Sequence, residues 1–464
     1  MARVKTHRGL IEQDCLERIR QAITKTVNQT SASVIRISTD LPLLDPLSVM
    51  NQAAVGEALY WSRRGEQRET VGLGILHEIQ GTGPVEASKL FDQMTTLLKD
   101  ADPTIRFYGG FNFLVGVPAM RPSLWQGLPQ YRFVLPRFEI VRTVEGCRLH
   151  VNLIREESSA ERERTLEQLA LLRWPDEMNT DDLPSLQERI DRPDYEQWRA
   201  MIEKVLHEIK VNKVQKVVLA REAEMRFNGP LAMNVLLGRL RAISKDCFGF
   251  GLQFRSGEAW IGATPERIFY RNGRSLQVEA VAGTRPRGSD SRQDEQFASS
   301  LLVDGKERRE HELVADHIRT VLRRFCGSVV NDNPSGGPGP VVIKQARVQH
   351  LSSRFSGELN EGVSDGELLC ALHPTPAVGG TPRDEAVAMI QALEPFDRGW
   401  YAGPIGTVGS RAAEFAVAIR SGLLCGSRLR LYSGAGIVEG SVPESEWDEI
   451  ENKLSSFKSA LGEL

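Results

Sequence analysis

The chain has 464 residues, of which 41% are hydrophobic and 26% are charged, a composition typical of a globular protein with one large core or two smaller ones. Its 58 Lys and Arg residues face 61 Asp and Glu residues, for a net charge of -3. This balance provides no overall positive field for nucleic acid or for an anionic membrane surface. An anionic ligand must therefore be bound by local cations.

The N-terminal sequence and the cysteines indicate a cytoplasmic protein. Residues Met1–Gln21 mix acidic and basic side chains and lack the continuous apolar core of a signal peptide. No apolar run in the sequence is long enough to span a bilayer. The six cysteines are far apart, with no CxxC pair and no zinc-type spacing to histidine. We therefore expect reduced thiols, a cytoplasmic location, no membrane association and no nucleic-acid partner.

The first 190 residues carry short apolar runs separated by Gly and Pro, a pattern that predicts mixed strands and helices. These runs are Ala32–Ile37, Val71–Leu76 and Phe111–Val117. The stretch Arg155–Tyr195 is rich in Glu, Arg and Asp, which predicts exposed helices and loops, and it lacks the Gly and Ser runs of a flexible linker. We therefore divide the chain into an N-terminal portion, residues 1–190, and a second portion, residues 191–464, of one fold.

The pattern is sharper in the second portion. Lys213–Ala220 is β-branched and apolar and predicts a strand, whereas Leu231–Ile243 has helical spacing. Because turn residues separate the following apolar runs, antiparallel hairpins are expected rather than parallel crossovers. Further strands are expected at Cys247–Phe254, Ala259–Ala263, Leu276–Ala282, Val341–Val348, Ala412–Leu424 and Arg428–Tyr432, helices at Gln293–Phe325 and Glu444–Leu461, and a turn-rich loop at Asn331–Pro340.

Three common cofactor motifs are incomplete or absent. The segment Gly434–Gly440 has the wrong glycine spacing for a dinucleotide loop, and Pro443 follows it where a helix should open. His311 and His317 are six residues apart and fall on different helix faces, unlike a zinc-binding helix. The sequence contains no phosphate-binding GxxxxGK[ST] loop.

Two predicted helices carry carboxylates beside apolar positions. In the last helix, Glu446, Glu449 and Lys453 align next to an apolar stripe. That stripe consists of Ile450, Leu454, Phe457 and Leu461. Glu310 lies on the face of Val314 and His317, where a charge needs a partner or a cation. Spacing alone leaves open a metal site and ordinary surface ion pairs.

Two further residues are candidates for proton transfer. Lys216 lies inside an apolar strand, and Glu266 follows Thr264 and Pro265 just after another predicted strand. From the residues alone, the simpler interpretations are a lysine that extends its amine to solvent and a glutamate that caps a turn.

Eight ordered motifs in the second portion resemble the chorismate-utilising enzymes. They are KVVLARE (Lys216–Glu222), GATPER (Gly262–Arg267), VAGTRPRG (Val281–Gly288), EHELV (Glu310–Val314), VQHL (Val348–Leu351), LHPTPAVGGTPR (Leu372–Arg383), EPFDRGWYAGPIG (Glu394–Gly406) and SGAGIVEGSVPESEWDE (Ser433–Glu449). This resemblance implies an α/β fold of the α+β type, a single large unit in which antiparallel β-sheets pack face to face and helices surround them.

Particular positions favour isochorismate synthase within this family. Ala282 precedes Gly283 and Thr284, where aminodeoxychorismate synthases have lysine. The segment His373–Ala377 has the form typical of isochorismate synthases, whereas anthranilate and salicylate synthases begin it with Phe-Pro. Ammonia-using members lack a base at Lys216, so the resemblance implies that water is the nucleophile and that no glutamine amidotransferase subunit is needed.

The alternatives are salicylate synthase, which adds pyruvate elimination, and a catalytically silent partner subunit. The long N-terminal portion and Phe396–Tyr401 resemble menaquinone-type members more than those that supply catecholate siderophores.

The resemblance also assigns roles to individual residues. Lys216 matches the base that activates water for attack at C2 of chorismate, and Glu266 matches the acid that protonates the departing 4-hydroxyl. Glu310 and Glu449 match Mg²⁺ ligands, with Glu446 as a direct or water-mediated partner. The implied substrate-binding residues are the cations Arg420 and Lys453, the pocket residue His350, and backbone groups around Gly283, Thr284, Gly434, Ala435 and Gly436.

Overall fold

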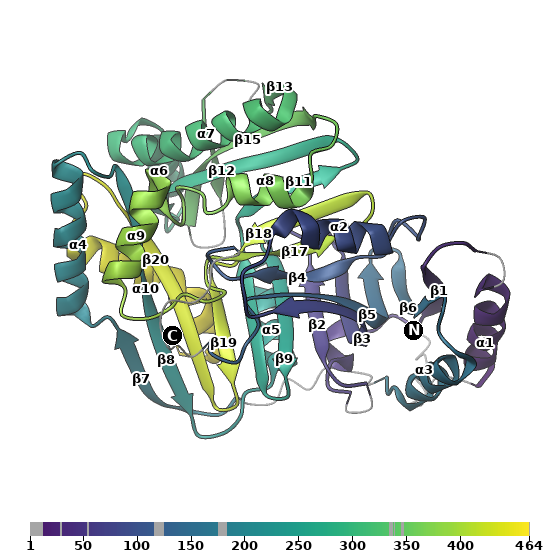
Figure 1. Cartoon of the computed structure of the whole chain (residues 1–464). Coiled ribbons are helices and arrows are strands. Elements are labelled where there is room, and N and C mark those ends of the chain that lie inside the picture. Colours follow the sequence, from purple (N-terminus) through teal and green to yellow (C-terminus); the bar gives the residue numbers. More distant parts are fainter. Residues whose placement is uncertain are drawn as a thin grey trace.

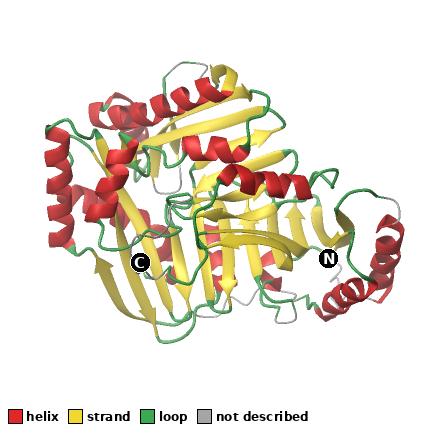
Figure 2. Cartoon of the chain, viewed as in Figure 1, coloured by secondary structure: helices red, strands yellow, loops and turns green. Residues whose placement is uncertain are grey.

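The computed structural model describes residues 13–27, 30–52, 55–115, 125–174, 183–333, 337, 339–344 and 348–463. Helices lie around the outside of a large antiparallel sheet, as Figures 1 and 2 show. The fold class predicted from the sequence is therefore confirmed. No helix in these ranges is long and apolar enough to cross a membrane.

The helices of the described ranges are mostly short. They are α1 (Gln13–Val27), the 3-10 helix η1 (Pro46–Val49), α2 (Ala87–Leu97), α3 (Ser159–Leu171), α4 (Tyr195–Lys210), α5 (Met233–Ile243), α6 (Ser291–Val303), α7 (Gly305–Phe325), α8 (Asp365–Leu372), α9 (Arg383–Leu393) and α10 (Pro443–Leu461).

The strands of the described ranges join into one hydrogen-bonded sheet. They are β1 (Val34–Leu41), β2 (Ala58–Ser62), β3 (Glu69–Gly81), β4 (Phe107–Phe111), β5 (Tyr131–Thr143), β6 (Gly146–Ile154), β7 (Leu186–Arg192), β8 (Lys216–Phe227), β9 (Phe248–Arg255), β10 (Glu258–Thr264), β11 (Arg267–Asn272), β12 (Ser275–Pro286), β13 (Cys326–Asn331), β14 (Val341–Lys344), β15 (Val348–Leu359), β16 (Gly380–Thr381), β17 (Pro404–Val408), β18 (Ala412–Val417), β19 (Ser421–Cys425) and β20 (Arg428–Ile437).

The strands β1 to β6 pair with one another and join strands of the second portion at two separate places. β2 pairs with β9, and β4 pairs with β17, with Gly109 opposite Gly406. A Cβ atom at Gly109 would lie 1.8 Å from a backbone oxygen of β5, so only glycine fits there. The N-terminal strands therefore complete the sheet that carries the second portion.

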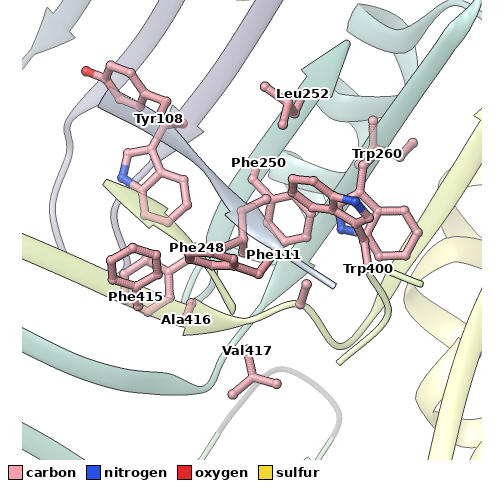
Figure 3. Close-up of a cluster of buried hydrophobic side chains, with 14 of the residues drawn as sticks. Tyr108, Phe111, Phe248, Phe250, Leu252, Trp260, Trp400, Phe415, Ala416 and Val417 are labelled. Atoms are coloured by element: carbon pink, nitrogen blue, oxygen red, sulfur yellow. The ribbon is translucent and has the colours of Figure 1, made fainter. Parts of the chain in front are cut away.

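The aromatic core also draws on both portions. Figure 3 shows Tyr108 and Phe111 of β4 in the same cluster as side chains of β9, β10 and β18. Phe415 is fully buried, and its ring centroid lies 5.6 Å from that of Phe91 in α2. Burying a large aromatic side chain stabilises a fold by about 2–3 kcal/mol, so removing either partner would destabilise both portions.

The helix predicted at Gln293–Phe325 is wrong in one respect, because it is two helices. α6 ends at Val303 and α7 begins at Gly305, with Asp304 extended between them at φ -67° and ψ 121°. The carboxylate of Asp304 accepts hydrogen bonds from the backbone N–H groups of Lys306 and Glu307, at 2.9 and 3.0 Å. This N-cap opens a new helix and sets the direction of α7.

Two predicted strands are also divided. In place of one strand at Val341–Val348 there is a hairpin, in which Lys344 of β14 pairs with Gln349 of β15. The predicted strand at Ala412–Leu424 is interrupted after Val417, and Arg420 adopts a left-handed φ of 50° before β19 begins. The interruption turns the chain toward the candidate site.

The elements predicted for the N-terminal portion match the structure less closely than those of the second portion. The runs at Ala32–Ile37 and Val71–Leu76 fall in β1 and β3, but β4 ends at Phe111, where a third run was expected to begin, and residues 116–117 lie outside the described residues. The exposed stretch Arg155–Tyr195 contains α3 and also the unexpected strand β7. The expected loop at Asn331–Pro340 is described only in part. The division of the chain at residue 190 stays a prediction.

Candidate active site

Lys216 begins β8, at the point where β8 pairs with β16 and lies next to β20. Its side chain is fully buried, and Nζ donates a hydrogen bond of 2.8 Å to Oε1 of Glu310 in α7. A Cβ at Gly436 of β20 would lie 2.7 Å from Cε of Lys216 and 2.9 Å from that same oxygen. Glycine at this position therefore makes room for the pair of Lys216 and Glu310.

Glu266 lies in the turn that joins β10 to β11, and its side chain is buried. Its backbone carbonyl accepts a hydrogen bond of 3.0 Å from the N–H of Val417. Burial raises the pKa of Glu266 to about 7, although the charges of Lys216 and Lys453 act against the shift. A carboxyl group with this pKa can hold and release a proton near neutral pH.

The three predicted metal-binding carboxylates each contact a lysine. Besides the pair of Glu310 and Lys216, Glu446 of α10 accepts from Lys306 at 3.1 Å, and Glu449 pairs with Lys453 at 2.6 Å. Burial and the neighbouring Glu449 raise the pKa of Glu446. Burial opposes the charge on Glu449, but Lys453, Lys306 and His350 together outweigh it, so the pKa of Glu449 is lowered. Within the described ranges, no three acidic, histidine or cysteine side chains form a ready-made metal cluster.

A cavity of about 740 Å³ lies beside these groups. Six of the predicted site residues line it: Thr284, His350, Arg420, Glu446, Glu449 and Lys453. The lining also contains the cations Lys245, Arg285 and Lys306. A cavity lined by several cations suits a small ligand with carboxylate groups.

The other predicted residues do not line this cavity but connect to it. Lys453, in the lining, donates from Nζ to the backbone oxygen of Gly434 at 2.9 Å. Gly434, Ala435 and Gly436 are consecutive in β20, opposite β8 and its Lys216. Gly283, with a φ of 79°, precedes Thr284 at an irregularity in the pairing of β12 with β15.

His350 is an uncharged polar group of the lining. Burial lowers its pKa to about 3, and the positive charges of Arg420 and Lys453 act in the same direction. Nδ1 lies 3.0 Å from Oγ1 of Thr284, whereas Nε2 is buried and has no hydrogen-bond partner among the described residues. A bound ligand can therefore supply the missing partner of Nε2.

Several residues of the cavity lining were not predicted from the sequence, among them Glu307 and Lys306. Glu307 lines the cavity, accepts the backbone N–H of Thr284 at 2.8 Å, and has its pKa raised by burial and by Glu310. Lys306 also lines the cavity and holds Glu446. The available signal was spacing, because Glu307 lies three residues before Glu310 and shares its helix face.

An antiparallel sheet with a buried lysine, a buried glutamate and a cation-rich cavity fits the chorismate-utilising enzymes that the motifs resemble. The chain matches the family described as chorismate binding enzyme over residues 18–462 and belongs to that family.

Particular relatives are similar over nearly the whole chain. The isochorismate synthase MenF of Bacillus subtilis (strain 168) is 34% identical, with 97% of this chain and 98% of the relative covered. The salicylate biosynthesis isochorismate synthase of Pseudomonas aeruginosa PAO1 is 32% identical, with coverages of 97% and 95%. The solved structure of MenF, the menaquinone-specific isochorismate synthase from Escherichia coli, matches with a TM-score of 0.82 at 29% identity and covers 96% of this chain and 99% of that one.

Proposed function

We propose that the chain is an isochorismate synthase, an isomerase that adds water at C2 of chorismate and removes the 4-hydroxyl group. The similarity to isochorismate synthases extends over almost the full length of the chain, including the N-terminal portion. The observation that supports the mechanism is that a buried lysine and a buried glutamate lie on separate elements, and that Glu266 interacts electrostatically with Lys453 and Arg420 of the cavity lining.

Glu266 is the proposed acid. Hydroxide is a poor leaving group, so departure of the 4-hydroxyl needs a proton from a nearby group. Burial holds the pKa of Glu266 at about 7, which keeps a transferable proton on this carboxyl under neutral conditions.

Lys216 is the proposed base. To take a proton from water the amine must be neutral, and in this structure Nζ donates a hydrogen bond of 2.8 Å to Glu310. The amine is therefore expected to contact water when another cation engages the carboxylate of Glu310.

Mg²⁺ is the proposed cofactor, and the residues present suit it. Glu310, Glu449 and Glu446 provide the carboxylate oxygens that a hard divalent ion prefers, and Glu307 lies next to Glu310 on α7. When bound, the ion would supply positive charge for a substrate carboxylate. Each of these three carboxylates pairs with a lysine, so the negative charge of the site needs cations to balance it.

Substrate binding is proposed to use the remaining residues of the lining. Arg420 and Lys453 offer positive charge to the carboxylates of chorismate, and His350 offers a neutral ring nitrogen. The glycines at 283, 434 and 436 leave room for the groups around the proposed substrate, because a Cβ there would crowd Glu307, the Tyr401 hydroxyl, and the pair of Lys216 and Glu310, respectively.

The deciding experiment is incubation of the purified chain with chorismate and Mg²⁺, with identification of the product. We expect reversible formation of isochorismate, loss of activity on chelation, and recovery with Mg²⁺ better than with Zn²⁺. Stoichiometric pyruvate with salicylate would favour the alternative of salicylate synthase. Full activity in a metal-free sample would exclude the Mg²⁺ site.

We further propose that the product feeds menaquinone synthesis, because the similar structure from E. coli is that of a menaquinone-specific enzyme. The Pseudomonas relative is a salicylate biosynthesis enzyme, so a siderophore route is the competing possibility. Deleting the gene and measuring cellular menaquinone and siderophore separately would distinguish the two. A glutamine amidotransferase subunit is not needed in either route, and the cytoplasmic location stays a prediction.

A further inference from the structure

The turn that carries Glu266 is held by three hydrogen bonds. Oγ1 of Thr264 donates to the backbone oxygen of Val417 at 2.6 Å, and the N–H of Val417 donates to the backbone oxygen of Glu266 at 3.0 Å. The third comes from Arg64, in the turn between β2 and β3, whose guanidinium donates to the backbone oxygen of Pro265. The N-terminal portion thus contacts the residue directly before the proposed acid.

The same guanidinium has a second partner. Another nitrogen of Arg64 pairs with Glu279 of β12, whose side chain is 4% exposed. Arg267 holds the other oxygen of Glu279 at 2.9 Å. Arg64 therefore bridges a backbone oxygen and a buried carboxylate, which suits the planar fork of a guanidinium and not the single nitrogen of a lysine.

Packing fixes this arrangement further. The guanidinium carbon of Arg64 lies 5.5 Å from the centroid of the Phe248 ring, and that of Arg267 lies at the same distance. Phe248 is fully buried in the aromatic core of Figure 3. Both arginines thus lie against the same buried ring.

Charges from several elements act on Glu266. They come from Lys216 of β8, Lys453 of α10, Arg420 before β19, Arg64 and Glu279, and the uncharged hydroxyl of Tyr401 also faces this carboxyl group. The positive charge of Arg64 favours the ionised form of Glu266, whereas the negative charge of Glu279 favours the protonated form. The pair of Arg64 and Glu279 therefore balances two opposite influences on the same carboxyl group.

We propose that Arg64 is a positioning residue for Glu266, fixing the turn from Thr264 to Arg267 and compensating the charge of Glu279 without contacting the substrate. The inference rests on the proposed function of Glu266 as the acid. It gives the N-terminal portion of the chain a direct part in the reaction.

The test compares Arg64→Met with Arg64→Lys and with the control Arg63→Met. Arg63 lies on the same turn, but its side-chain hydrogen bonds go to Glu414 and Glu66, so it reaches the turn of Glu266 only through Arg267, which shares Glu414. We expect Arg64→Met to lower kcat by about tenfold or more with little change in KM, because a displaced acid transfers its proton poorly. Arg64→Lys should also lower kcat, while Arg63→Met should keep it.

The pH profile separates positioning from a merely structural role. Losing the Arg64 charge raises the pKa of Glu266, so the alkaline limb of kcat should move to higher pH in Arg64→Met and stay in place in Arg64→Lys. Glu279→Gln removes the opposite charge, so the alkaline limb of kcat should move to lower pH in this variant. If Arg64→Met fails to fold, Glu279→Gln still tests the coupling to Glu266. An unchanged kcat and limb in Arg64→Met, or an equal shift in Arg63→Met, would overturn the proposal.

A second measurement does not depend on activity. Infrared difference spectra can follow the titration of the Glu266 carboxyl, identified by the band that Glu266→Gln removes. The shift of this titration should have the same sign as the shift of the kinetic limb in each variant. If the parent chain forms no isochorismate but the titration still shifts with Arg64→Met, the proposed function fails while the coupling of Arg64 to Glu266 stands. If the titration does not shift, the coupling fails even in an active enzyme.

Discussion

At the scale of single residues, Lys216 and Glu266 have distinct chemical requirements. Arginine at position 216 would keep the positive charge next to Glu310 but cannot lose a proton, so we expect Lys216→Arg to fail almost as badly as Lys216→Ala. Glutamine at position 266 keeps the shape but has no transferable proton, so kcat should fall by about a hundredfold or more while KM changes little. Steady-state kinetics on folded variants test both.

These two outcomes can fail independently. A Lys216→Arg variant that retains most of its kcat would mean that Lys216 supplies charge and not a proton acceptor. A Glu266→Gln variant within about threefold of the parent, well short of a typical acid-base contribution, would assign the acid to another group.

The buried carboxyl of Glu266 also lowers the stability of the folded state, by an amount that depends on pH. Its pKa is about 7 in the folded chain against an ordinary 4.5, so between these values the folded state holds a proton that the unfolded state has released. Stability therefore falls as pH rises through this window, and the whole penalty is present above pH 7. At about pH 8, urea denaturation should give Glu266→Gln a free energy of unfolding that is roughly 1–3 kcal/mol above that of the parent. At about pH 4.5 the two free energies of unfolding should differ little. An equal difference at both pH values would contradict this account.

At the scale of secondary-structure elements, Asp304 connects the fold to the site. It caps α7, which carries Lys306, Glu307 and Glu310 within its first two turns. We expect Asp304→Ala to destabilise the chain by about 1 kcal/mol and also to raise KM for chorismate and weaken activation by Mg²⁺, because these side chains lose their orientation. Asp290→Ala, which removes the N-cap of α6, is the matched control.

The control Asp290→Ala tests whether the kinetic effect depends on which helix loses its N-cap. Asp290 accepts from the N–H of Gln293 at 2.9 Å but begins a helix that carries none of the proposed site residues. Thermal unfolding should therefore change in both variants, whereas kinetics should change only in Asp304→Ala. A similar KM in both variants would show that the start of α7 does not set the site.

The elements also show why some boundaries could be predicted and others could not. The last helix was predicted at Glu444–Leu461 and begins one residue earlier, because its apolar period and Pro443 are local signals. The division at Asp304 has a local signal in Asp304 followed by Gly305, but helical spacing on both sides conceals it. The interruption at Arg420 has only a weak local signal in Ser421-Gly422, and the chain there is held by tertiary hydrogen bonds, such as that from the N–H of Ala263 to the backbone oxygen of Arg420.

In the candidate site as well, local sequence signals could be predicted and tertiary contacts could not. The motifs named Lys216 and Glu310, but the two are 94 residues apart and only the fold brings them to 2.8 Å. Arg64 lies in the N-terminal portion, outside the motifs, and contacts Pro265 across 201 residues of sequence. Spacing along the chain carries no information about such contacts, so the sequence predicted the motif residues and not the residues that position them.

At the scale of the whole molecule, the two portions of the chain share one sheet and one core. If the N-terminal portion were removed, β9 would lose its partner β2 and β17 would lose its partner β4. The boundary at residue 190 also falls inside β7. We therefore expect one cooperative unfolding transition, with coincident circular dichroism and fluorescence curves. A fragment of residues 191–464 should expose unpaired strand edges and buried rings such as Phe415, and should neither unfold cooperatively nor turn over chorismate. Two separate transitions, with a cooperative fragment, would instead make the portions independent domains.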